Sequence, residues 1–124
     1  MKSINTKQAP VAIGPYSQAV QIGNMVFVSG QIPLDPTTQT LTVGGVASQT
    51  QQVLQNIQAI VMAAGGQLSQ IVKTTIYLTD LAAFAAVNEV YGQFFTEPYP
   101  ARATVQVAAL PKGAQIEIDC IVML

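Results

Sequence analysis

Residues 46–79 are VASQTQQVLQNIQAIVMAAGGQLSQIVKTTIYLT, and the spacing of apolar side chains changes within this stretch. Up to Ala64 the apolar residues recur every three or four positions, which is the period of an amphipathic helix. A glycine pair follows, as is usual at the C-terminus of a helix. Over 71–79 the side chains alternate between two faces, with Val72, Thr74, Ile76 and Leu78 on one of them, which predicts a strand. A helix followed by a strand therefore forms the centre of the predicted fold.

Two short strands and a loop are predicted before this unit. The Gly-Asn pair at 23–24 favours a tight turn, and it joins apolar segments over 17–22 and 25–29 into a predicted hairpin. The next segment, 31–40, is rich in Pro, Asp and Thr and is expected to be a loop.

A helix and two strands are predicted after the central unit. Residues 84–95 carry Phe, Val and Tyr at helical spacing, and Asp80 is a plausible cap before them. Two prolines within 97–100 end that helix. Alternating patterns then predict strands over 101–107 and 115–123, which we expect to pair as an antiparallel hairpin.

The order strand-helix-strand-helix-strand-strand indicates an α+β fold in which both helices cover one face of a sheet. The other face must then meet solvent or another subunit. The chain has 124 residues, which suits one domain. Only 9% of the residues are charged, whereas about 25% is usual in soluble domains, and half are apolar. A chain with so few charges on its surface is expected to form a homo-oligomer.

The residue types that are missing exclude several kinds of site. The sequence has no His, which excludes Ser-His and Cys-His nucleophile pairs. Its single Cys cannot build an ordinary zinc site or a disulfide within the chain, and this residue, Cys120, alternates with apolar neighbours and is expected in the core. Five Lys and Arg residues and a net charge of −1 argue against nucleic acid as a partner. No apolar run reaches the ~20 residues of a membrane span, and residues 1–5 lack the apolar centre of a signal peptide. We expect a soluble cytoplasmic protein.

Arg102, the only arginine, is the centre of the candidate site. The expected C-terminal hairpin would place Arg102 and Thr104 on the same face as Glu117 and Asp119. A guanidinium binds a carboxylate through two parallel hydrogen bonds, and a partly buried glutamate is suited to move protons near neutral pH. The alternative is that Arg102 forms a structural ion pair with one of the two carboxylates.

Several motifs resemble those of the Rid family (reactive intermediate deaminases, also called YjgF-like proteins). The resemblance covers essentially the whole chain, 1–124, as a single Rid domain, and it fits the imine-deaminating subgroup named RidA. Its motifs are APVAIGPYSQAV at 9–20, VSGQIP at 28–33, IVKTT at 71–75, FAAVN at 84–88, PARATV at 100–105, ALPK at 109–112 and IEI at 116–118.

The resemblance implies a chorismate-mutase-like α+β fold, a homotrimer, and active sites in the clefts between subunits. It implies hydrolysis of 2-imino acids, such as 2-iminopropanoate and 2-iminobutanoate, to 2-keto acids and ammonia without a cofactor. Such imines are released by pyridoxal-phosphate dehydratases and damage other pyridoxal-phosphate enzymes, so the family activity is protective.

The resemblance also assigns residues. Arg102 matches the arginine that binds the substrate carboxylate, and Glu117 matches the glutamate that holds or activates the attacking water. The predicted catalytic residues are Arg102, Glu117 and Tyr16, and the predicted substrate-binding residues are Arg102, Ser29, Gly30, Asn88 and Thr104. Two features depart from the family pattern, because Thr104 stands where a Cys is frequent and the segment 96–100 is shorter than usual.

Other functions stay open at this point. A non-catalytic trimer could bind keto acids or amino acids through Arg102, and a chaperone-like protein could use the low-charge surface. A nuclease is disfavoured by the charge balance. A chorismate mutase is disfavoured because a dianionic substrate needs several cations, and each subunit offers one arginine.

Overall fold

A six-stranded mixed sheet forms the frame of the molecule. The computed structural model describes every residue, Met1–Leu124. The strands follow the order β1-β2-β3-β8-β6-β7, and all neighbouring pairs are antiparallel except the parallel pair of β6 and β7. Their bounds are β1 Lys2–Ile4, β2 Ala19–Ile22, β3 Met25–Gln31, β6 Ile71–Leu78, β7 Ala101–Gln106 and β8 Ile116–Met123. A separate pair of two-residue strands, β4 Leu34–Asp35 and β5 Thr40–Leu41, lies in and just beyond the segment expected to be a loop.

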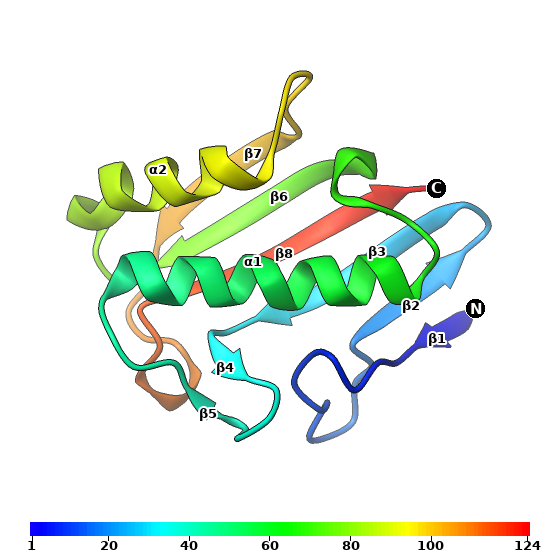
Figure 1. The fold of residues 1–124 in the computed structure, drawn as a ribbon, viewed down its shortest axis with the longest axis horizontal. Coiled ribbons are helices and arrows are strands. Elements are labelled where there is room, and N and C mark those ends of the chain that lie inside the picture. Colours follow the sequence, from blue (N-terminus) through cyan, green and yellow to red (C-terminus); the bar gives the residue numbers. More distant parts are fainter.

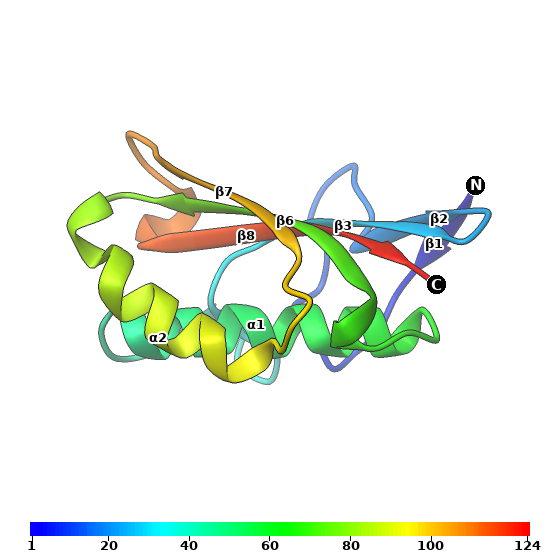
Figure 2. The ribbon, with the colours of Figure 1, turned by 90° about the horizontal axis from the view of Figure 1, so that it is seen from above.

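Two helices, α1 (Val46–Ala63) and α2 (Phe84–Phe94), lie side by side on one face of this sheet (Figure 1). In the view from above, both helices lie on the same side and the opposite face of the sheet is uncovered (Figure 2). The predicted α+β architecture is therefore confirmed. Three short 3-10 turns complete the chain, η1 Leu68–Gln70, η2 Leu81–Ala83 and η3 Pro111–Gly113. None of the helices has the length and apolar character that crossing a membrane would take.

The core lies between α1 and the sheet. One stripe of α1 is fully buried, and it belongs to the same apolar cluster as side chains of the central strands β3, β6 and β8. No charged residue lies in the first or last turn of α1, so this packing is the main source of its stability. The helix ends as predicted, because Gly65 adopts a positive φ of 88° and the N–H of Gly66 donates to the carbonyl of Val61 at 3.0 Å. Cys120 is buried as expected, and burial raises the pKa of its thiol to about 12.

The expected hairpin between the last two strands is wrong. Strand β6 lies between β7 and β8, and β7 pairs with β6 in parallel. The parallel pairing follows from the connection through α2, because a helix that crosses from one strand to the next returns the chain in the same direction. This correction changes which residues can meet at the site.

Two irregularities interrupt the strand patterns. Val72, predicted to share a face with Thr74, Ile76 and Leu78, is exposed whereas those three are buried, and Ile71 is buried in its place. The register of β6 on β8 shifts between Ile71 and Lys73, so that one extra residue is accommodated in a β-bulge. A second shift lies between Val28 and Gln31 in β3, and it contains the predicted site residue Gly30.

Candidate active site

The predicted site residues form two clusters on opposite faces of the sheet. Arg102 pairs in register with Thr74 of β6, and Glu117 pairs with Tyr77 of the same strand. Side chains three positions apart on a strand point to opposite faces, so Arg102 faces the helices and Glu117 faces the uncovered side. The predicted convergence of Arg102 and Thr104 with Glu117 and Asp119 is therefore wrong within one chain, and so is the alternative of an ion pair between them.

The first group, the arginine cluster (Phe84, Asn88, Tyr91, Arg102), forms where β7 meets α2. The Nη1 of Arg102 donates a hydrogen bond to Oδ1 of Asn88 at 2.7 Å. The guanidinium carbon lies 4.9 Å from the centre of the Tyr91 ring and 5.4 Å from that of Phe84, which places the cation between two aromatic faces. Arg102 is exposed, and a guanidinium has five N–H donors, so donors remain for a ligand carboxylate.

Two further groups support the arginine cluster. The hydroxyls of Tyr91 and Thr74 are hydrogen-bonded at 2.8 Å, which fixes the ring beneath the guanidinium. Thr104 pairs in register with Ile76 on the same face, and its buried hydroxyl oxygen has no hydrogen-bond partner. An open cavity of about 340 Å³ adjoins the cluster and is lined by Asn88, Tyr91, Gly92, Tyr99, Pro100 and Arg102.

The second group, the glutamate cluster (Tyr16, Gly30, Lys112, Glu117), surrounds a larger cavity of about 420 Å³. The exposed ring of Tyr16 forms part of its wall. Ser29, predicted to bind substrate, does not line this cavity, and its hydroxyl donates to the carbonyl of Ser17 at 2.6 Å. Ser29 thus ties β3 to the segment that carries Tyr16.

Glu117 is half-buried and has the electrostatics of a proton carrier. Burial raises the pKa of its carboxyl above the ordinary value, and the neighbouring charge of Asp119 raises that pKa further. The backbone of Gly30 lies close to the Glu117 carboxylate, because a side chain at position 30 would overlap that carboxylate. The bulge in β3 thus brings bare backbone against the carboxylate, which only glycine permits without displacing it.

Sequence reasoning missed the aromatic part of the arginine cluster. The helical spacing of the Phe and Tyr residues over 84–95 indicates a core face, and Tyr91 is buried, but Phe84 is exposed beside Arg102. The signal that could have found the cluster is the spacing of Phe84, Asn88 and Tyr91, which places all three on one side of a helix. Asn88, predicted to bind substrate, contacts Arg102 directly.

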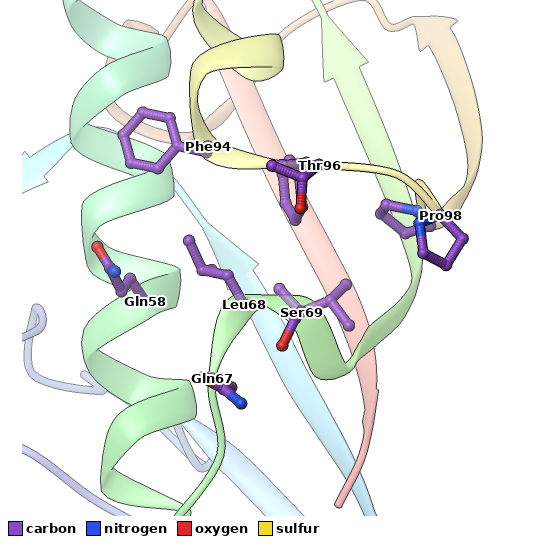
Figure 3. Close-up of a pocket in the computed structure, with 10 residues that line it drawn as sticks. Gln58, Gln67, Leu68, Ser69, Phe94, Thr96 and Pro98 are labelled. Carbon is purple, nitrogen blue, oxygen red and sulfur yellow. The ribbon is translucent and has the colours of Figure 1, made fainter.

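A third cavity, of about 270 Å³, is separate from both clusters (Figure 3). It lies between α1, η1 and the segment after α2, and Figure 3 shows Gln58, Leu68 and Phe94 around it. No charged residue and no predicted site residue lines it. No group of three or more His, Cys, Asp or Glu side chains in the structure could hold a metal ion.

Comparison with known proteins matches nearly the whole chain to one family. Residues 6–124 match the family described as Endoribonuclease L-PSP. A protein of Homo sapiens named 2-iminobutanoate/2-iminopropanoate deaminase is 50% identical over 118 residues, which cover 95% of this chain and 86% of that protein. The crystal structure of RidA from an Antarctic Psychrobacter superimposes with a TM-score of 0.97 at 52% identity, covering 100% of both chains. Escherichia coli TdcF with bound serine superimposes with a TM-score of 0.95 at 49% identity, covering 100% of this chain and 99% of that one.

Proposed function

The chain belongs to the Endoribonuclease L-PSP family, and from this premise we propose that it hydrolyses small 2-imino acids, such as 2-iminopropanoate and 2-iminobutanoate, to 2-keto acids and ammonia. One observation carries the proposal. A single small chain offers an exposed arginine with unused donors and a half-buried glutamate whose pKa is raised. About half of its residues are identical to those of the human protein named for this activity.

The reaction needs binding, one placed water and one proton carrier. Arg102 holds the substrate carboxylate through two parallel hydrogen bonds while Asn88 fixes the guanidinium. Glu117 accepts a proton from a water as its oxygen bonds to C2 of the imine, and the C=N π electrons move to nitrogen. The proton on Glu117 then passes to that nitrogen, which gives a carbinolamine. Glu117 next takes the proton of the new hydroxyl as the keto C=O forms, and this proton is delivered to the nitrogen as the C–N bond breaks and ammonia leaves. Tyr16 closes the wall of the cavity.

Arg102 and Glu117 meet only if two chains contribute to one site. The arginine cluster of one subunit faces the glutamate cluster of its neighbour in the homotrimer that the Rid resemblance implies. The uncovered sheet face supports self-association, because large apolar side chains are exposed on it. These exposed residues are Ile22, Phe27, Val105 and Met123. Removing reactive imines would protect pyridoxal-phosphate enzymes in the cytoplasm, which stays a prediction.

A non-catalytic carboxylate-binding trimer is the second candidate. The observation that favours it is the serine bound to Escherichia coli TdcF, since serine carries a carboxylate and is not an imine. Glu117 separates the two functions, because binding a carboxylate requires Arg102 alone and hydrolysis requires both residues. A ribonuclease, which the family description suggests, finds little support in a chain with no His and five Lys and Arg residues.

The test is an assay of imine lifetime. A threonine dehydratase generates 2-iminobutanoate in solution, a semicarbazide trap competes for the imine, and keto-acid release is followed with and without the protein. We expect faster release and less trapped imine when the protein is present. Equal rates with and without it would overturn the proposed activity.

Replacing Gly30 with alanine should reduce activity while leaving stability almost unchanged. The new methyl group overlaps the Glu117 carboxylate, which is the end of a flexible side chain and can swing aside. The free energy of unfolding should therefore change by less than about 1 kcal/mol. Because small displacements of catalytic groups are costly, kcat should fall roughly 10- to 100-fold.

The matched control is Gly45→Ala, where an added Cβ meets no atom within 4 Å and φ is an ordinary −85°. This variant should keep full activity in the imine assay. Equal kcat values for Gly30→Ala and Gly45→Ala would show that the contact between Gly30 and Glu117 does not position the carboxylate.

A further inference from the structure

Strand β8 carries two carboxylates on the uncovered face of the sheet. Glu117 and Asp119 are two positions apart and therefore point to the same side. Their cross-strand partners on β6 are Tyr77 and Thr75, respectively. The proposed reaction uses Glu117 and leaves Asp119 without a role.

The two carboxylates differ in their hydrogen bonds. The hydroxyl of Tyr77 reaches diagonally across the pair and donates to Oδ2 of Asp119 at 2.9 Å. This hydrogen bond to Asp119 is also the main cause of the raised pKa of Tyr77. Glu117 accepts no hydrogen bond within the chain, although Tyr77 is its direct neighbour across the strands. A donor thus occupies one oxygen of Asp119, and the oxygens of Glu117 stay free for a water.

The other groups around Glu117 do not offset the charge of Asp119. Gly30 on β3 and the phenol of Tyr16 are neutral. Lys112 of η3 lines the same cavity, but only burial and Asp119 alter the pKa of Glu117, and both raise it. Lys73 pairs with Ile121, further along β8 than Asp119.

We infer that Asp119, held by the Tyr77 hydroxyl, is a positioning residue that supplies a fixed negative charge and thereby makes Glu117 the proton carrier. The inference rests on the proposed function for its catalytic meaning. When two carboxylates lie close together and one is held ionised, the proton is taken up by the other. The two carboxylates then have different roles, because Asp119 stays charged while Glu117 gains and loses the proton.

Titration of the wild-type protein tests directly which of the two carboxylates takes up the proton first. The ¹³C signals of the side-chain carboxyls are followed by NMR as pH is lowered, with Glu117 identified from Glu117→Gln and Asp119 from Asp119→Glu. We expect Glu117 to take up its proton at higher pH than Asp119. Uptake in the reverse order, or in one common step, would overturn the inference. This measurement does not depend on activity, so it stands apart from a failure of the proposed function.

The pH profile of kcat/KM tests the effect on catalysis. Asp119→Asn removes the negative charge, so Glu117 stays ionised to lower pH and the acidic limb should move to lower pH. At one pH unit below the midpoint of the wild-type acidic limb, kcat/KM is expressed as a fraction of each protein's own plateau. This fraction should be roughly two- to threefold higher in Asp119→Asn than in the wild type. An acidic limb that stays in place or moves to higher pH would contradict the inference.

Two variants separate charge from structure. Asp119→Glu keeps the charge and should return the acidic limb to near its wild-type position. Tyr77→Phe removes the hydroxyl that holds Asp119 but leaves both carboxylates, so its limb should move to lower pH by clearly less than that of Asp119→Asn. A downward shift in Tyr77→Phe as large as that in Asp119→Asn would show that the charge is not the cause. If Asp119→Asn fails to assemble, the titration of the wild-type protein still decides.

Discussion

Arg102→Ala should lower kcat/KM for 2-iminobutanoate roughly 100- to 1000-fold, because the substrate carboxylate loses two charge-assisted hydrogen bonds that together contribute about 3–4 kcal/mol. The side chain is exposed and contacts Asn88 and two aromatic rings. Its removal should therefore change the free energy of unfolding by no more than about 1 kcal/mol. Steady-state kinetics in the dehydratase-coupled assay measure the first effect, and denaturant unfolding measures the second.

Arg102→Lys is the informative companion. Lysine keeps the positive charge but cannot form two parallel hydrogen bonds with a carboxylate, so this variant should recover only a small part of the activity. Lys2→Ala, at an exposed position of β1, removes a positive charge far from Arg102 in the strand order and serves as the control. Full activity in Arg102→Ala would support the chaperone-like alternative, in which the arginine has no part.

Glu117→Gln should lower kcat roughly 100- to 10,000-fold, which is the usual range for the loss of a general acid-base group. An amide cannot accept the proton of the attacking water or return one to nitrogen. KM should change little, since Arg102 still binds the carboxylate. Residual turnover will be limited by the spontaneous hydrolysis of the imine, so the uncatalysed rate is subtracted.

The matched control is Glu89→Gln, an identical change at an exposed position of α2. It should leave kcat unchanged. If Glu117→Gln retained the wild-type kcat while Arg102→Ala lost ligand binding, the protein would be the carboxylate-binding trimer and not an enzyme of this mechanism.

The elements of the fold could be predicted from periodicity, whereas the neighbours of one strand could not. Alternation in β8 marks a core face clearly, because every second residue from Ile116 to Val122 is apolar and buried. Both faces of β7 are largely exposed, so no apolar face shows which side of the sheet Arg102 occupies. The pairing of β7 with β6 depends on the crossover through α2. The residue pattern of β7 alone does not indicate this pairing.

The candidate site was predicted residue by residue through the family resemblance, and its geometry was not. The bulges at Val72 and Gly30 add one residue to a strand, and a single inserted residue is invisible in an alternating pattern. Stacking of Arg102 against Tyr91 requires knowing that α2 lies beside β7. The hydrogen bond from Tyr77 to Asp119 likewise requires the register of β6 on β8.

The claim on which the account depends is that Arg102 of one chain and Glu117 of another act in one site. It is tested most directly by mixing Arg102→Ala and Glu117→Gln chains, each nearly inactive, through co-refolding or co-expression. Random mixing in equal amounts would give both intact residues at about one quarter of the interfaces, so roughly a quarter of the wild-type activity should return. Wild-type chains treated in the same way provide the reference. If the mixture stays as inactive as its two components while the reference recovers, the two clusters do not form a shared site.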